Sequence, residues 1–325
     1  MIAVLAGGVG AARLLMGMVQ AIPPTEITAI VNTADDEVIN GLHISPDLDT
    51  IVYTLAGAID PTKGWGLGEE SWSTMNALER YQSSRPEGSL AANTWFRLGD
   101  RDIATHLYRS TRLDEGADLT AVTQEIASSW GLDIRLVPMT NDRVATRLTL
   151  AADSLSPGQV QVEISFQEYF VLHRHSVPVA SIRYEGASIA RANPAAIDAL
   201  KQSERIVIAP SNPLLSIAPI LELAELKQCL TTRRGDVVAV SPIVNGSAIK
   251  GPADHLLSEL GCEPSVVGVA RLYSEFASTL VIDELDAALA NEVERCGMKC
   301  HVTKTVMDSP EIAATLSREL LKSSF

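Results

Sequence analysis

Short apolar runs that end in glycine, proline, asparagine or aspartate constrain the fold of this 325-residue chain more than any other feature. Patterns typical of helices separate several of these runs. Strands buried on both faces of a parallel sheet have this continuous Val, Ile, Leu and Ala character, so the order predicts βαβ units. The runs are IAVLA at 2–6, ITAIV at 27–31, RIVIA at 205–209, VVAV at 237–240 and TLVID at 279–283.

The residues between about 61 and 184 differ in character from those on either side. They include the tryptophan-bearing segment WFRLGDRDIATHLYRS at 95–110 and the alternating stretch QVQVEISFQEYFVLHRH at 159–175, which predicts a strand. We therefore expect a single α/β domain over 1–325. Its Rossmann-like parallel-sheet core would span about 1–60 and 185–325, and a mainly helical cap subdomain would be inserted at about 61–184. Ligands of such open sheets bind beyond the carboxyl ends of the strands.

Composition and charge narrow the function classes. With 40 acidic and 26 basic residues the formal net charge is −14, which argues against nucleic acid or an anionic membrane as the partner. Any anionic ligand must then be held by local features. The 4 cysteines lack the paired spacing of a zinc site, and no apolar stretch is long enough for a membrane span. We expect a cytoplasmic protein with reduced thiols and no membrane partner.

The stretch LAGGVGAARLL at 5–15 predicts a strand, a glycine turn and the start of a helix. Gly7, Gly8 and Gly10 would let backbone N–H groups approach a phosphate at the helix N-terminus. The dinucleotide fingerprint would require a third glycine where Arg13 stands and an acidic residue where Asn32 stands, so NAD binding is disfavoured. A tight turn that packs the helix without a ligand would also account for the glycines.

The stretch VNTADDEVINGLHISPDLDT at 31–50 concentrates carboxylates after the second strand. Ser45 and Pro46 are typical of an N-cap and a first helical residue, which puts Asp47 and Asp49 in a first turn, where acidic residues complement the helix dipole. That explanation covers a single aspartate better than it covers a cluster with no Lys or Arg nearby in sequence. The residues that we expect to bind Mg²⁺ or to act in catalysis are Asp35, Asp36 and Asp49.

Other polar residues have structural as well as functional explanations. Lys250, in the loop SPIVNGSAIKGP at 241–252, could meet a phosphate or face solvent. Ser211 and Asn212 follow a strand and suit base or phosphate recognition, although APSNP at 209–213 could be only a connecting loop. His173 and His175 alternate on the expected strand and are interpreted as structural.

Together these stretches resemble the 2-phospho-L-lactate transferases of coenzyme F420 biosynthesis, the CofD family. The resemblance extends in order from residue 1 to about residue 286 and is far more specific than a glycine turn alone. It rests on GGVGAARLL, VNTADD, GLHISPDLDTIVYTLAGAID, GWGLGEESW, WFRLGDRDIATHLYRS, PMTNDRVATR, FQEYFV, APSNPLLSIAPIL, VAVSPIVNGSAIKGPADHLL and VIDELD.

The resemblance implies a transferase that moves a phospholactyl or phosphoenolpyruvyl group from a guanosine diphosphate-linked donor to the terminal ribityl hydroxyl of the deazaflavin Fo. GMP would be released, and Mg²⁺ would assist. The family's Fo contacts fall on Asp49 and Arg97, and Asp49 and Asp36 are the expected catalytic residues. The remaining expected substrate-binding residues are Gly7, Gly8, Gly10, Asn32, Ser211, Asn212 and Lys250. A homodimer is also expected.

Alternatives remain open at this level. A non-catalytic regulator that binds a nucleotide sugar, from a distant branch of the same superfamily, would share the glycine turn, although SPDLDT and LGDRD favour the branch that uses Fo. Lactate, enolpyruvate and glycerate donors differ by a methyl, a double bond or a hydroxyl, which several loops would have to distinguish. Val9 and Ala11 stand where relatives often carry Thr or Gly, so the backbone role of the glycine turn would remain but a hydroxyl contact would be lost. VNTADD is not followed by the tryptophan that many relatives carry, so part of the Fo pocket would differ.

Overall fold

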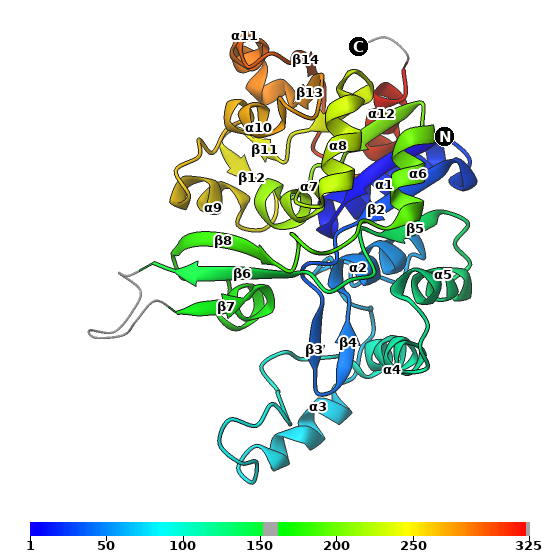
Figure 1. Cartoon of the computed structure of the whole chain (residues 1–325), viewed down its shortest axis with the longest axis vertical. Helices are drawn as coiled ribbons and strands as arrows, with labels where there is room; N and C mark the ends of the chain where they lie inside the picture. Colours follow the sequence, from blue (N-terminus) through cyan, green and yellow to red (C-terminus); the bar gives the residue numbers. More distant parts are fainter. Residues whose placement is uncertain (152–161, 323–325) are drawn as a thin grey trace.

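The computed structural model describes residues 1–151 and 162–322, and its centre is a seven-stranded parallel sheet in the order β14-β13-β10-β9-β1-β2-β5 (Figure 1). The five continuous apolar runs of the sequence all form strands of this sheet. The strands of the sheet are β1 (Ile2–Ala6), β2 (Ile27–Val31), β5 (Arg135–Pro138), β9 (Arg205–Ile208), β10 (Val237–Val240), β13 (Thr279–Ile282) and β14 (Lys299–Val302).

The strand order reverses between β1 and β9, which are direct neighbours in parallel register. From β1 the chain proceeds to β2 and β5 on one side, and β9 continues to β10, β13 and β14 on the other. The loops that leave β1 and β9 therefore diverge at the carboxyl edge of the sheet. Open α/β sheets bind their ligands in the crevice that such a reversal creates.

Helices cover both faces of the sheet because alternate residues of each strand point to opposite faces. Val4 and Ala6 pack against one helical layer, and Ala3 and Leu5 pack against the other. The first layer contains α1 (Gly8–Ala21), α2 (Pro46–Leu55), α5 (Leu119–Ser129) and α12 (Pro310–Leu320). The second contains α6 (Pro194–Gln202), α8 (Ala224–Thr232) and α10 (Val266–Tyr273).

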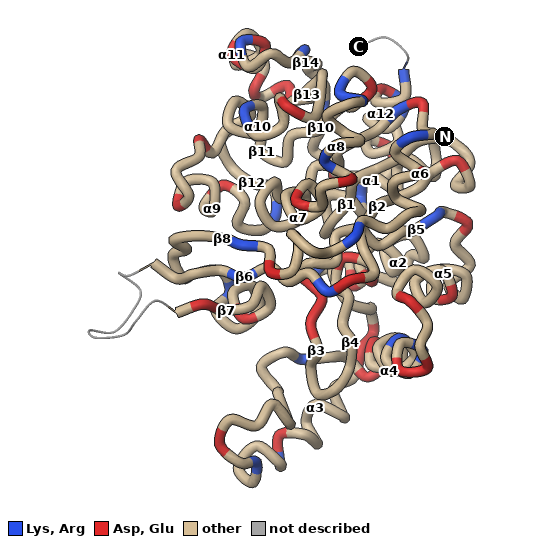
Figure 2. Tube along the Cα trace, viewed as in Figure 1, with Lys and Arg blue, Asp and Glu red and all other residues tan. Residues whose placement is uncertain are grey.

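Smaller units project from this core (Figure 1). A hairpin of β3 (Glu37–Ile39) and β4 (Leu42–Ile44) extends from the sheet toward α3 (Ser73–Leu78), beside α4 (Asp100–Asp114) (Figure 1). The acidic stretch that leads into this hairpin is visible in Figure 2. A three-stranded antiparallel sheet in the order β7-β6-β8 has its own small core; its strands are β6 (Ala145–Leu150), β7 (Glu163–Ser165) and β8 (Val179–Glu185).

The remaining elements are short connections. The helices are α7 (Ala218–Leu221), α9 (Ala253–Glu259) and α11 (Ala290–Arg295), and the small strands are β11 (Ile243–Val244) and β12 (Ser247–Ala248). Single turns are η1 (Pro24–Glu26), η2 (Glu79–Tyr81), η6 (Arg234–Asp236) and η7 (Glu284–Leu289), with π-helical turns at η4 (Glu168–Leu172) and η5 (Pro213–Ile217). No helix within residues 1–151 and 162–322 has both the length and the apolar character needed to cross a bilayer.

Two sequence predictions about elements are wrong in part. Residues 61–184 are not all inserted cap, because β5 forms an edge of the central sheet and α5 packs on its face. The strand expected over 159–175 is limited to β7 among the described residues, and a helical turn follows it; residues 159–161 lie outside them. His173 and His175 are therefore not on a strand.

Gly17 allows α1 and α12 to pack closely. A Cβ atom added at this position would overlap the backbone carbonyl group of Ala313. We expect Gly17→Val to lower the free energy of unfolding by about 1–3 kcal/mol, since the two helices would have to separate. Urea unfolding measures this change. Gln20→Ala, at an exposed position of the same helix, is the control and should change stability by less than about 0.5 kcal/mol. Equal stability of both variants would contradict the packing role.

Candidate active site

A cavity of about 860 Å³ lies at the carboxyl edge of the central sheet, where the strand order reverses. It is large enough for a bound small molecule, since ligand pockets typically enclose about 300–1,000 Å³. Of the predicted residues, those that line the cavity are Gly7, Gly8, Gly10, Asp35, Arg97, Ser211, Asn212 and Lys250. Asn32, Asp36 and Asp49 are not part of its lining and lie behind or beside it.

The glycine turn after β1 is tightly packed against the loop after β9. A Cβ atom on Gly10 would overlap the carbonyl oxygen of Pro210, and the Ser211 hydroxyl donates to the Gly7 carbonyl oxygen at 2.7 Å. Gly8 has a φ of +68°, a left-handed conformation that favours glycine. These residues therefore shape the crevice in addition to any ligand contact.

A carboxylate already lies beside this turn. The backbone N–H of Gly8 donates to Asp47, and a Cβ atom on Gly7 would come within 2.7 Å of Asp47 Oδ2. The positive end of the α1 dipole is thus partly compensated by a side chain of the protein. A phosphate bound near the turn would face this negative charge, which favours a cation between them.

Asp35 and Asp47 form a carboxylate pair at the cavity wall. The side-chain amide of Asn32 donates to Asp35 Oδ2 and to Asp47 Oδ2, at 3.0 Å in each case. The two aspartates are only 3% and 8% exposed, yet both line the cavity. Burial raises the pKa of Asp47 to about 6, and burial together with the charge of Asp47 raises the pKa of Asp35. Asp35 Oδ1 is buried and has no hydrogen-bond partner within the described residues.

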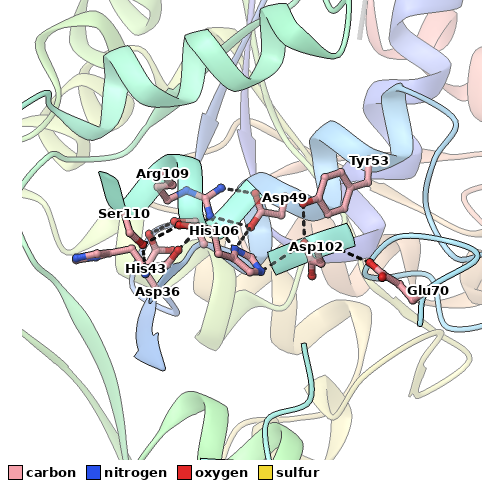
Figure 3. Close-up of polar contacts among 10 residues, drawn as sticks. Asp36, His43, Asp49, Tyr53, Glu70, Asp102, His106, Arg109 and Ser110 are labelled. Carbon is pink, nitrogen blue, oxygen red and sulfur yellow. Dashed lines mark hydrogen bonds and ion pairs between the residues drawn. The ribbon is translucent and has the colours of Figure 1, made fainter. Parts of the chain in front are cut away.

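Asp36 and Asp49 form a second pair, which faces Arg109 of α4 instead of the cavity (Figure 3). The terminal nitrogens of Arg109 hold both carboxylate oxygens of Asp49, with Nη1 to Oδ2 at 3.1 Å. The Ser45 hydroxyl donates to Asp36 Oδ2 at 2.6 Å. Burial opposes the charge of Arg109, but Asp49 and Asp36, with a smaller contribution from Tyr53, together outweigh this effect, and the pKa of Arg109 is raised. Sequence reasoning missed Arg109, which is 60 positions from Asp49.

A histidine extends this network along α4. His106 Nδ1 lies 3.7 Å from Asp49 Oδ2, and His106 Nε2 lies 3.4 Å from Asp102 Oδ1 (Figure 3). The Tyr53 hydroxyl of α2 donates to Asp102 Oδ1 at 2.6 Å. The network ties α2 to α4. His106 itself is buried.

Aromatic and basic residues form the cap side of the cavity. Trp72 has the Lys63 ammonium 5.0 Å and the Arg97 guanidinium 5.3 Å from its ring centre, distances at which a cation is attracted to an indole. Arg97 also donates to the Asn76 side chain at 2.7 Å. The other rings of this wall are Trp65, Trp95 and Phe96.

Lys250 joins the two sides of the cavity. Its ammonium donates to the Lys63 carbonyl oxygen at 3.2 Å, and burial together with the charge of Arg13 lowers its pKa. Arg13 and Lys250 both line the cavity, and neither forms an ion pair with an acid of the described chain. Two cations held near each other without a carboxylate suit an anionic ligand.

The fold and this cavity define a doubly wound α/β protein with its ligand site at the topological switch point. Residues 2–315 match the family described as 2-phospho-L-lactate transferase CofD, so the chain belongs to that family and is a transferase, as the sequence predicted.

Similar proteins share nearly the whole chain. The phosphoenolpyruvate transferase of Streptomyces griseus is 38% identical over 99% of this chain and 97% of its own length. Those of Nocardia farcinica and Mycolicibacterium smegmatis are 37% and 35% identical over 98% of this chain, and 93% and 96% of their own lengths. Among solved structures, a member of the UPF0052 family from Bacillus halodurans matches with a TM-score of 0.60 at 12% identity, over 99% of this chain and 98% of that one. This last likeness concerns the fold alone.

The Arg109–Asp49 pair should be essential for stability. Arg109→Met would leave the Asp49 carboxylate buried without its partner, and such a loss typically costs about 3–5 kcal/mol. In Arg109→Met/Asp49→Leu both charges are absent, so we expect part of the free energy of unfolding to return. Arg112→Met, which removes a partly exposed ion pair of the same helix, is the control and should cost at most about 1 kcal/mol. Chemical denaturation of all three variants tests this, and a double variant less stable than Arg109→Met would contradict it.

Proposed function

We propose that this protein transfers a phospho-three-carbon-acid group from a guanosine diphosphate-linked donor to the terminal ribityl hydroxyl of the deazaflavin Fo, in coenzyme F420 biosynthesis. The observation that carries the proposal is the combination, in one cavity, of a glycine turn, an unpaired carboxylate oxygen, unpaired cations and aromatic walls. Family membership supports the reaction class. The relatives named phosphoenolpyruvate transferase favour the phosphoenolpyruvyl group over the phospholactyl group.

The reaction would be a displacement at phosphorus. The hydroxyl oxygen of Fo forms a bond to the phosphorus that carries the acid, the bond from that phosphorus to the bridging oxygen breaks, and GMP leaves with this oxygen. The hydroxyl proton is released. Such a transfer depends on alignment and charge neutralisation more than on a strong nucleophile. The backbone of the glycine turn, Arg13 and Lys250 would bind phosphate oxygens from opposite sides of the crevice.

The carboxylate pair fits Mg²⁺. This ion prefers one or two carboxylates together with water and substrate phosphates, and Asp35 offers a buried oxygen without a partner at the cavity wall. No three-residue group of His, Cys, Asp or Glu suited to a metal occurs among the described residues, so substrate and water would complete the coordination. Asp35 and Asp47 would hold the ion, and Asn32 would orient both. When bound, Mg²⁺ neutralises charge on the phosphate oxygens as the leaving group departs.

Asp36 and Asp49 would contribute from behind this pair. Their carboxylates are held by Ser45 and Arg109, which fixes the loop after β2 and the first turn of α2. Asp35 and Asp47 are on these same two segments. The catalytic role expected for Asp36 and Asp49 from the sequence would therefore be exerted through the position of their neighbours.

Product analysis tests the proposed reaction. The purified protein should convert Fo and the enolpyruvyl donor, in the presence of Mg²⁺, into GMP and a phosphodiester whose mass is that of Fo plus the phosphoenolpyruvyl group. The lactyl and glyceryl donors are the comparison substrates, and mass spectrometry identifies each product. Binding of nucleotide sugars without any binding of Fo would instead indicate a non-catalytic regulator that binds a nucleotide sugar. No product from any donor, with Fo and nucleotide both bound, would refute the transfer.

The metal-binding assignment has its own test. Asp35→Asn and Asp47→Asn should each abolish the rise in melting temperature that Mg²⁺ produces with GDP, because a ligand that binds the folded state stabilises it. Turnover should also fall by about 100-fold or more, because each variant would lose several kcal/mol of charge stabilisation in the transition state. Asp133→Asn, on an exposed loop, is the control and should behave as the unmodified protein does. If the Mg²⁺ effect were lost only in Asp49→Asn, the metal would instead bind at the pair formed by Asp36 and Asp49.

A further inference from the structure

The buried side of α4 connects the first turn of α2 to the chain segment 70–74, which carries Trp72. Three polar side chains on this side, Asp102, His106 and Arg109, follow one another at helical spacing and face α2 (Figure 3). None of the three lines the cavity. They can therefore act on a ligand only through the residues that they hold in place.

His106 is oriented from both sides. Arg109, which holds Asp49, also has its Nη1 atom 3.2 Å from His106 Nδ1. A guanidinium can only donate, so His106 Nδ1 is the acceptor, and the ring hydrogen of the neutral imidazole is on Nε2. This hydrogen faces Asp102, because Nε2 lies 3.4 Å from Asp102 Oδ1. An apolar side chain in place of the imidazole would remove both contacts.

Tyr53 joins α2 to the same network. It follows Asp49 by one helical turn, and its hydroxyl donates to Asp102 Oδ1 at 2.6 Å. α2 is therefore bound to α4 at two successive turns, through Asp49 and through Tyr53. Asp47, a proposed Mg²⁺ ligand, lies in the first turn of α2 beside Asp49. The position of this ligand in the cavity wall consequently depends on α4.

Glu70 supplies the cap at the N-terminus of α4. The N-cap residue, Gly99, has no side chain to do so, and the Glu70 carboxylate accepts from the backbone N–H groups of Arg101 and Asp102 at 2.8 Å each. A Cβ atom on Gly99 would come within 2.1 Å of Glu70 Cδ, so the glycine leaves room for this carboxylate. A negative charge at this end of a helix satisfies otherwise unpaired N–H groups and complements the helix dipole.

Asp100 returns the same contact to segment 70–74. Its carboxylate accepts from the backbone N–H groups of Ser73 and Thr74 at 2.9 Å each. These residues directly follow Trp72, whose ring lines the cap side of the cavity and lies 5.3 Å from the Arg97 guanidinium. α4 thus contacts the cap side of the cavity through its first turn and α2 through its buried side.

We propose that α4 couples the metal-binding turn of α2 to segment 70–74, with Tyr53 and His106 as positioning residues. Occupancy of the metal site fixes α2, α2 fixes the buried side of α4, and the first turn of α4 orders the segment. The inference rests on the proposed function, which places a metal, a nucleotide and an acceptor in one cavity. Such coupling is reciprocal, so nucleotide with metal and acceptor should strengthen each other's binding by the same factor.

Hydrogen exchange of the full chain tests the coupling, with mass spectrometry of peptides that cover residues 70–78 and 99–104. In the unmodified protein, saturating Mg²⁺ and GDP should slow exchange of both peptides about tenfold, because their N–H groups are held by Glu70 and Asp100. In His106→Leu and Tyr53→Phe, exchange should stay within about twofold of the ligand-free rate, although calorimetry shows that GDP is bound.

Two further variants separate positioning from general stability. His106→Gln keeps a hydrogen-bond donor and an acceptor, so it should retain the protection that His106→Leu loses. Tyr108→Phe is the matched control for Tyr53→Phe, because it removes an exposed hydroxyl on the outer side of α4 that donates to Glu125. It should be protected as the unmodified protein is.

The reciprocal measurement is the affinity for Fo, from its fluorescence, with and without Mg²⁺ and GDP. Nucleotide and metal should tighten Fo binding to the unmodified protein about tenfold. In Tyr53→Phe and His106→Leu the gain should be at most about twofold, while the affinity for Fo alone is unchanged.

The outcomes separate this inference from the proposed function. Failure of the unmodified protein to bind Fo or GDP would refute the function and the coupling together. If it binds both but neither peptide is protected, the function stands and the coupling is wrong. Protection in His106→Leu and Tyr53→Phe equal to that of the unmodified protein would also refute the coupling, as would its loss in Tyr108→Phe. Melting temperatures establish that each variant is folded, and Tyr53→Phe, which removes a single hydroxyl, remains decisive if His106→Leu is not.

Discussion

The reversal of strand order between β1 and β9 is the constraint on which the rest of the site depends. Two parallel strands that are neighbours in the sheet send their chains in opposite directions, so the loops at their carboxyl ends cannot cover each other. The close approach of Gly10 to the Pro210 carbonyl and the bond from Ser211 to Gly7 fix how far these loops separate. The crevice is therefore a consequence of backbone packing.

Charge burial explains why the acidic cluster divides into two pairs. A buried carboxylate is unfavourable unless a partner compensates it, and one guanidinium can satisfy only the carboxylates within its reach. Arg109 compensates the Asp49 carboxylate, whereas burial raises the pKa of Asp36 although the Ser45 hydroxyl and the charge of Arg109 oppose this effect. Asp35 and Asp47 share the amide of Asn32, neither forms an ion pair within the described residues, and their pKa values are raised. The two pairs therefore differ in that the rear pair contains an ion pair with Arg109, whereas Asp35 and Asp47 carry their negative charge where a ligand can reach it.

The sequence predicts the centre of this fold better than its edges. Strands buried on both faces are continuous apolar runs, whereas the edge strands RLVP at 135–138 and KCHV at 299–302 include exposed or polar positions and have no such signature. The aspartates could be predicted from their density, but Arg109 could not, because only the folded chain brings α4 to α2. The turn at 166–175 was predicted as strand from its alternation, although the Ser165 to Glu168 spacing of a capping box is a helix signal in the same stretch.

The distribution of charge inside the cavity reconciles an acidic protein with an anionic donor. The net charge of −14 is spread over the molecule, and at physiological salt its field is screened beyond about 8 Å, so nearby groups decide what binds (Figure 2). Burial lowers the pKa of Lys250, and repulsion by the Arg13 charge lowers it further, yet Lys250 is held against the Lys63 carbonyl. An anion between these cations would relieve their repulsion. A cation at Asp35 would in turn relieve the repulsion between the carboxylates of Asp35 and Asp47. A phosphate ligand with its metal therefore matches both halves of the site, whereas either alone would leave one half uncompensated.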